Sequence, residues 1–195
     1  RRHPAPLLDC ARAFTLIREH AGEWLLDPAK LGLMGFSAGG HLALSGAVFY
    51  DRDFAAAPGI NPALSRPDAL MLCYPVVVSG EFAHRGSFEF LLGKNPDPRL
   101  LELLSLEKQV REDMPPVFLW HTYADEGVPV ENSLFLASAL RRAGVSLEMH
   151  IFHEGHHGLS LATVETEAGN PANVNPHVAH WFPLCLSWLE SRFKG

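Results

Sequence analysis

Three residues of this 195-residue chain have the types and the order needed for nucleophilic catalysis: Ser37, Asp125 and His157. A serine hydroxyl attacks poorly until a neighbouring base takes its proton, and the base works best when a carboxylate fixes its tautomer. We therefore predict acyl transfer with Ser37 as the nucleophile, His157 as the base and Asp125 as the group that orients the base. The order Ser, Asp, His along the chain is one of three that serine hydrolases use.

The serine lies in the motif Gly-Phe-Ser-Ala-Gly at residues 35–39, between an apolar run at 31–34 and a small-residue segment at 38–49. A strand, a sharp turn and a helix in this order form a nucleophile elbow, which exposes the serine hydroxyl on a strained turn. The glycines at both ends of the motif are expected to leave room for the turn and for the close approach of helix and strand. The backbone N–H of Ala38, at the helix N-terminus, is the predicted oxyanion donor. The alternative is an ordinary glycine-rich turn.

The predicted carboxylate has two rivals in the same part of the chain. Asp125 follows an apolar run, as the motif serine does, but Glu126 is its neighbour and Asp113 precedes the same run. A further alternative gives Asp125 a structural role, as a loop carboxylate that caps the helix predicted to begin at Pro129. The position directly after a strand favours Asp125.

The predicted base lies among several histidines. His153 and His156 are close to His157 in one loop, and any of the three could be a solvent-exposed histidine without a catalytic role. His156 is the main alternative to His157. Two further histidines, His41 and His121, are expected to be structural or to lie near the site without taking part in proton transfer.

Residues 153–157 also satisfy the pattern H-E-x-x-H of zinc proteases. That pattern binds zinc only on a helix, which places both histidines on one face. Here the pattern follows a predicted strand, and Gly155 and Gly158 indicate a loop. No third ligand is evident, so we do not expect a metal site.

Apolar runs and helical periodicities alternate along the chain, which predicts an α/β fold with a mainly parallel sheet flanked by helices. In such a sheet the functional loops follow the carboxyl ends of the strands, where the three candidate residues lie. The predicted strands are residues 31–34, 69–78, 117–121 and 147–152, and the predicted helices are 7–21, 38–49, 129–144 and 181–189, with a surface loop at 51–68.

Length and composition indicate one domain over residues 1–195, with a cap or lid around 79–116. The net charge of −6 provides no basic face for nucleic acid, and no apolar run is long enough to cross a membrane. The dispersed cysteines, Cys10, Cys73 and Cys185, indicate buried thiols rather than disulfides or a zinc site. No signal peptide is recognisable, which predicts a cytoplasmic protein, although the sequence opens without a Met.

These motifs together resemble the α/β-hydrolase superfamily, and within it the bacterial acetyl-esterase and xylan-esterase-like branch. The resemblance implies hydrolysis of short acyl esters, often acetyl groups on sugars, with a small-molecule ester as the partner and no cofactor. In that family the histidine before a Gly-Leu pair is catalytic, which favours His157 over His156. The matching segments are residues 27–28, 35–42, 114–122, 125–133 and 155–159.

The resemblance is incomplete at the N-terminus. The family's His-Gly-Gly-Gly-type oxyanion loop has no counterpart between Arg1 and Pro28, so the chain is expected to lack the early strands of the sheet. The strand at 31–34 would then have an unpaired edge, which favours a homo-oligomer. The alternatives to an esterase are a hydrolase-like binding protein that is inactive or weakly active, and a serine peptidase or formamidase with the same order of residues.

Overall fold

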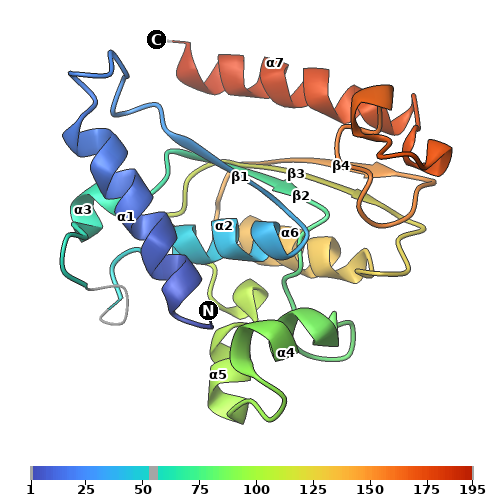
Figure 1. The fold of residues 1–195 in the computed structure, drawn as a ribbon, viewed down its shortest axis with the longest axis horizontal. Coiled ribbons are helices and arrows are strands. Elements are labelled where there is room, and N and C mark those ends of the chain that lie inside the picture. Colours follow the sequence, from blue (N-terminus) through green and yellow to red (C-terminus); the bar gives the residue numbers. More distant parts are fainter. Residues whose placement is uncertain (1, 53–56, 195) are drawn as a thin grey trace.

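The computed structural model describes residues 2–52 and 57–194, and its centre is a four-stranded sheet (Figure 1). The strands lie in the order of the sequence, and each neighbouring pair is parallel. All four carboxyl ends therefore meet at one edge of the sheet, and the predicted α/β class with a mainly parallel sheet is confirmed. The strands are β1 (Gly32–Phe36), β2 (Ala69–Cys73), β3 (Val117–Thr122) and β4 (Leu147–Phe152).

Helices cover both faces of this sheet (Figure 1). In that view α7 lies above the strands, whereas α2 and α6 lie below them. The α-helices are α1 (Ala5–Glu19), α2 (Ala38–Val48), α3 (Pro62–Ser65), α4 (Arg85–Leu92), α5 (Pro98–Leu103), α6 (Glu131–Arg142) and α7 (Trp181–Phe193). The short 3₁₀ turns are η2 (Leu106–Lys108), η3 (Val164–Thr166), η4 (Pro171–Asn173) and η5 (Val178–His180).

Alternate residues of the central strands fill two separate apolar layers, because successive side chains of a strand point to opposite faces. In β3, Leu119 packs in the layer with α2 and α6, and Trp120 packs in the layer with α7. The Trp120 ring stacks on Trp181 of α7 with ring centroids 5.1 Å apart. Burial on both faces explains why β2 and β3 are continuous apolar runs in the sequence.

Two strands differ from the sequence prediction. The apolar run at 69–78 leaves the sheet after Cys73, because Tyr74 has a φ of 38° and Pro75 has no N–H to donate. The first strand is only partly buried, because among the described residues it pairs with β2 alone and forms an edge of the sheet. Between Asp51 and Asp68, predicted as loop, the short helix α3 forms; residues 53–56 lie outside the described part of the chain.

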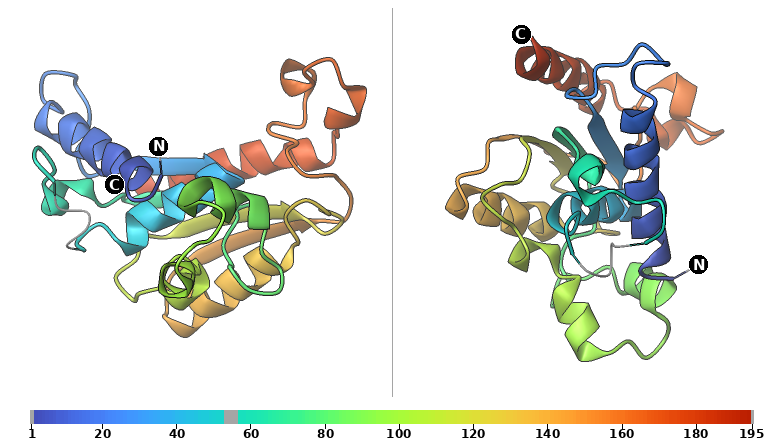
Figure 2. Two further views of the ribbon diagram at one scale, coloured as in Figure 1. Left: turned by 60° about the horizontal axis from the view of Figure 1, so that its bottom comes forward. Right: turned by 90° about the vertical axis from the view of Figure 1, so that its left-hand side faces the viewer.

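The region 79–116, predicted as a cap, contains α4, α5 and η2. Figures 1 and 2 show α4 and α5 projecting from the sheet, close to the start of α1. A hydrogen bond of 3.0 Å from the His3 N–H to the Leu91 carbonyl joins these two parts. Among residues 2–52 and 57–194, none of the helices is both long enough and apolar enough to span a bilayer.

Candidate active site

Ser37 occupies the turn between β1 and α2, with φ 53° and ψ −120°. A non-glycine residue in such a conformation costs about 1–3 kcal/mol, so the surrounding structure must hold it in place. Four backbone hydrogen bonds do so. The Ser37 N–H donates to the Cys73 carbonyl at 2.9 Å, and the Ser37 carbonyl accepts from Gly40 at 3.0 Å, Val76 at 3.1 Å and His41 at 3.2 Å. The end of β2 thus supports the strained turn.

The glycines of the motif have different roles. A Cβ on Gly35 would collide with the carbonyl oxygen of Gly39, and a Cβ on Gly40 would lie 2.7 Å from Pro75 Cβ. A Cβ on Gly39 would meet nothing within 4 Å. The expectation that Gly39 leaves room for the turn is therefore wrong, because Gly35 and Gly40 are the positions where helix and strand approach closely.

His157 follows β4 and lies between the serine and the carboxylate, 120 residues from Ser37 in the sequence. Its Nε2 is 2.7 Å from Ser37 Oγ, and its Nδ1 is 2.7 Å from Asp125 Oδ2. The carboxylate accepts the proton of Nδ1–H, which leaves Nε2 of the neutral ring free to accept the hydroxyl proton. The imidazole side chain keeps 27% of its surface exposed, so a ligand above Ser37 can also reach it.

Asp125 is buried in the loop between β3 and α6, and both of its carboxylate oxygens have donors. Oδ1 accepts the N–H groups of Gly127 at 2.9 Å and Val128 at 2.8 Å. Burial acts to raise the pKa of Asp125, but the hydrogen bonds from His121, His157 and Val128 outweigh it and hold the pKa well below its ordinary value. The carboxylate is therefore ionised at neutral pH, as a group that orients an imidazole must be.

The rival residues lie elsewhere. Glu126 is exposed, and the Asp113 carboxylate binds the Arg111 guanidinium at 2.7 Å. His156 is exposed and its Nδ1 donates to the His157 carbonyl at 2.8 Å. His153 is exposed beside Glu154.

The H-E-x-x-H segment does not form a helix. Strand β4 ends at Phe152, and residues 153–158 form a loop in which Gly155 and Gly158 have positive φ. Among the described residues, no cluster of three or more His, Cys, Asp or Glu side chains is arranged to hold a metal ion. Cys73 and Cys185 are buried free thiols, and Cys10 is half-buried.

A further residue contacts the histidine and was not among the predicted site residues. The Tyr74 ring stands at the carboxyl end of β2, and its hydroxyl accepts the Ser160 N–H at 3.0 Å. Burial raises the pKa of Tyr74 to about 12, so the hydroxyl stays protonated at neutral pH. The apolar pattern places Tyr74 inside the strand predicted over 69–78, so its position at the end of β2 could not be predicted from the sequence.

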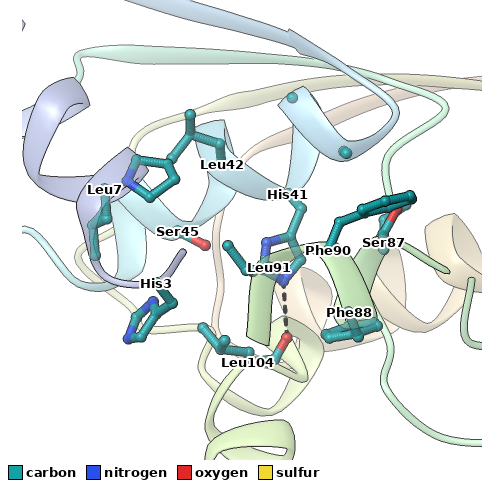
Figure 3. Close-up of a pocket in the computed structure, with 14 residues that line it drawn as sticks. His3, Leu7, His41, Leu42, Ser45, Ser87, Phe88, Phe90, Leu91 and Leu104 are labelled. Carbon is teal, nitrogen blue, oxygen red and sulfur yellow. Dashed lines mark hydrogen bonds between the residues drawn. The ribbon is translucent and has the colours of Figure 1, made fainter. Parts of the chain in front are cut away.

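His41, predicted to be structural, is buried in the first turns of α2. Its Nε2 lies 3.0 Å from the Leu104 carbonyl, and burial lowers its pKa to about 4, so the ring is neutral near pH 7 and Nε2–H donates this bond. His41 also lines a cavity of about 340 Å³ that begins at Ala38, beside the elbow (Figure 3). The cavity continues between α2 and α4 as far as Phe88 and is largely apolar; its lining includes Ala38 and Gly39 but not Ser37.

Ala38 is the first residue of α2, so its N–H has no acceptor within the helix. The residue is exposed, and its amide directly follows the strained serine. This N–H therefore lies at the positive end of the helix dipole, one residue after Ser37.

Comparison with known proteins gives one family and several esterase-type relatives. The sequence profile described as the prolyl oligopeptidase family matches residues 8–182. The chain is 42% identical over 167 residues to endo-1,4-beta-xylanase B of Butyrivibrio fibrisolvens, covering 86% of this chain and 26% of that protein. It is 32% identical to the acetylxylan esterase of Xylanibacter ruminicola, covering 81% of this chain and 32% of that protein.

Among solved structures, the acetyl ester-xyloside bifunctional hydrolase of Caldicellulosiruptor lactoaceticus superposes with a TM-score of 0.85 at 47% identity. The superposition covers 98% of this chain and 67% of that one. The chain thus spans about a quarter to a third of the two curated relatives described above. The resemblance to α/β-hydrolases of the esterase type, expected from the motifs, is confirmed.

Proposed function

This chain belongs to the prolyl oligopeptidase family, and from that premise we propose that it hydrolyses short-chain, acetyl-type carboxylic esters by a serine acyl-enzyme mechanism. Ser37 is the nucleophile, His157 the general base and acid, Asp125 the group that orients His157, and the Ala38 N–H an oxyanion donor. The substrate is a small-molecule ester, and an acetylated sugar is the class we favour. No cofactor takes part in these steps.

One observation supports this proposal above the others. The hydrogen bonds from Ser37 Oγ to His157 Nε2 and from His157 Nδ1 to Asp125 Oδ2, each 2.7 Å long, form a continuous chain. The three residues come from three separate loops at the carboxyl edge of the sheet, where α/β folds place their functional groups. A structural polar network does not require its serine to lie on a strained turn with φ 53°.

The geometry gives the order of proton transfers in the first half of the reaction. Ser37 Oγ attacks the ester carbonyl carbon while His157 Nε2 takes the hydroxyl proton. The carbonyl oxygen becomes an oxyanion, which the Ala38 N–H stabilises. The Asp125 carboxylate stabilises the imidazolium and keeps its proton on Nδ1. When the tetrahedral intermediate collapses, Nε2–H protonates the leaving alcohol, and the acyl group remains on Ser37.

In the second half, water replaces the alcohol. His157 Nε2 takes a proton from the water, whose oxygen attacks the acyl carbonyl, and the proton then returns to Ser37 Oγ as the acid leaves. A single oxyanion donor contributes about 2.7–4 kcal/mol, a factor of roughly 10²–10³ in rate. The amide of Ala38 is the donor that the described residues supply next to the nucleophile.

The ester class follows from the relatives. Two of them have acetyl esters in their names, the acetylxylan esterase and the acetyl ester-xyloside bifunctional hydrolase, and the latter is 47% identical to this chain. The cavity beside Ala38 is bounded on the α4 side by Phe88 and Phe90, which favours an uncharged acyl ester over an anionic one.

The test compares the protein with Ser37→Ala on p-nitrophenyl acetate and on acetylated xylo-oligosaccharides. We expect turnover by the wild type and a loss of at least about 10³-fold in the variant, because the residual rate would come from binding and oxyanion contacts alone. A fluorophosphonate probe should label the wild type at Ser37 and leave the variant unlabelled. Equal rates for the two proteins would refute the proposal.

A peptidase is the second candidate, because the matching family profile is named for an oligopeptidase. The same three residues can cleave an amide, which requires His157 to protonate an amine as it leaves. Side-by-side assays with acetyl esters, an aryl formamide and blocked dipeptides separate the two activities. Probe labelling of Ser37 without turnover of any of these substrates would instead indicate a hydrolase-like binding protein.

A further inference from the structure

A second imidazole contacts the carboxylate of the proposed catalytic site. His121 is the penultimate residue of β3, and its side chain, like that of Asp125, has no exposed surface. Its Nε2 lies 3.2 Å from Asp125 Oδ2, the same oxygen that is 2.7 Å from His157 Nδ1. One carboxylate oxygen is therefore shared by two histidine rings.

The neighbours of His121 fix the position of its proton. Nε2 faces two acceptors, the Val128 carbonyl at 2.9 Å and Asp125 Oδ2, so this nitrogen must carry a proton. The hydrogen bond of 2.9 Å goes to the carbonyl, and the carboxylate oxygen lies 3.2 Å from the same nitrogen. On the other side of the ring, Nδ1 lies 2.7 Å from Ser133 Oγ, which can donate to it.

These contacts tie together both ends of the loop that holds the carboxylate. Val128 donates its N–H to Asp125 Oδ1 at 2.8 Å and accepts from His121 through its carbonyl, so the three residues form a closed ring of contacts. Ser133 lies in the first turn of α6, and His121 lies in β3. The His121–Ser133 pair thus spans from the strand before the loop to the helix after it.

We propose that His121, held by Ser133, is a positioning residue for the catalytic carboxylate. It donates from Nε2 toward Asp125 Oδ2 and so fixes the direction in which that oxygen meets His157 Nδ1. This inference rests on the proposed function, because it assigns a role within the same site. Small displacements of such a group matter, since a shift of about 1 Å in a catalytic array can reduce the rate by about 10²-fold.

The proposal is tested with two replacements of His121. In His121→Gln the amide nitrogen can take the place of Nε2 and donate to both acceptors, whereas His121→Leu keeps the bulk but has no donor. We expect kcat to fall by less than about tenfold for Gln and by about 100-fold for Leu, with KM little changed in both. His153→Gln, which replaces an exposed histidine near the site, is the control and should match the wild type.

A purely structural role for His121 would give a different pattern. The proton shared by His157 Nδ1 and Asp125 gives a downfield proton NMR resonance, which should persist in His121→Gln and shift or disappear in His121→Leu. A folded Leu variant with wild-type kcat and an unmoved resonance would overturn the proposal. Equal losses for Gln and Leu with an unmoved resonance would also overturn it.

If His121→Leu does not fold, Ser133→Ala replaces it, because this variant removes only the partner of Nδ1. We then expect a severalfold loss of kcat with a shifted resonance, and an unmoved resonance with unchanged kcat would contradict the inference. The resonance is present whether or not esters are hydrolysed, so a wild type without turnover would refute the proposed function while the role of His121 is still judged by NMR.

Discussion

The ring of Tyr74 stands edge-on to the ring of His157, with centroids 5.0 Å apart and 75° between the planes. The Tyr74 hydroxyl also accepts the N–H of Ser160, so one side chain contacts the imidazole and the loop that follows it. Tyr74 is held in turn by β3, because its N–H donates to the Trp120 carbonyl at 2.7 Å. The end of β2 therefore supports both the nucleophile turn and the base.

Replacing Tyr74 by Phe should separate these two contacts. The edge-on ring remains, but the Ser160 N–H loses its acceptor, so we expect the free energy of unfolding to fall by about 1–3 kcal/mol with a smaller effect on kcat. Urea denaturation and steady-state kinetics measure the two quantities. Tyr123→Phe, at an exposed tyrosine, is the control. Equal stability of the two variants would contradict the role given to the Tyr74 hydroxyl.

The two adjacent histidines should behave in opposite ways when each is replaced by Ala. His157→Ala removes the base and should lower kcat by at least about 10³-fold. His156→Ala removes an exposed ring whose Nδ1 donates to the His157 carbonyl, and kcat should stay within about threefold. Ester hydrolysis at saturating substrate gives both values. A larger loss for His156→Ala than for His157→Ala would indicate that His156, and not His157, is the base.

Asp125→Asn should lower kcat by about 10⁴-fold, because an amide can hold the His157 ring in the wrong tautomer. The neighbouring Glu126 is exposed, so Glu126→Gln changes charge by the same amount at the same loop without touching the ring. Its kcat should match the wild type. If both variants lose activity alike, the net charge of the loop and not the bond to His157 is responsible.

The elbow glycines predict a contrast in stability. A Cβ at Gly40 would press against Pro75 at 2.7 Å, so Gly40→Ala should lower the free energy of unfolding by about 1–3 kcal/mol. Gly39→Ala has open space and lies in a helix, where Ala is favoured over Gly by up to about 1 kcal/mol. Its stability should therefore equal or exceed that of the wild type in urea denaturation. Equal destabilisation of both variants would refute this contrast.

His41 should make stability depend on pH. Burial lowers its pKa to about 4 in the folded protein, against about 6.5 in an unfolded chain. Between these values the unfolded state binds a proton that the folded state does not, so stability is lost as pH falls from about 6.5 to 4. The full difference is about 3 kcal/mol. Urea denaturation at pH 7 and pH 5 should show a smaller change for His41→Leu than for the wild type, and equal changes would contradict this prediction.

Much of the sheet could be predicted from the sequence, because its strands are short and its central strands are buried. Residues 117–120 form an uninterrupted apolar run at the start of β3, whereas apolar and polar residues mostly alternate over 147–152, where β4 lies. The strand predicted over 69–78 is too long by five residues, because the pattern of apolar residues does not reveal the backbone turn at Tyr74. The parallel arrangement of the strands could be predicted because the predicted strands alternate with helices.

The candidate site was predicted in part. Position after a strand and the motif at 35–39 singled out Ser37, Asp125 and His157, and the structure brings these side chains together. The network around His121 could not be predicted, because His121 and Ser133 look in the sequence like a strand residue and a helix residue without a partner. The role of Gly40 could not be predicted either, because the atom that a Cβ there would meet belongs to Pro75, which follows β2.

The strand order has a consequence for synthesis of the protein. Neighbouring strands of the sheet are also neighbours in the chain, so β1 to β3 and the Ser37 turn are synthesised before β4. His157 is made 120 residues after Ser37, a delay of roughly 6–24 s at about 5–20 residues per second. For the last part of that interval, after Asp125 has been made, the nascent chain has the serine and the carboxylate but no base. The proposed Ser37–His157–Asp125 array is therefore complete only after the loop that follows β4 has been made.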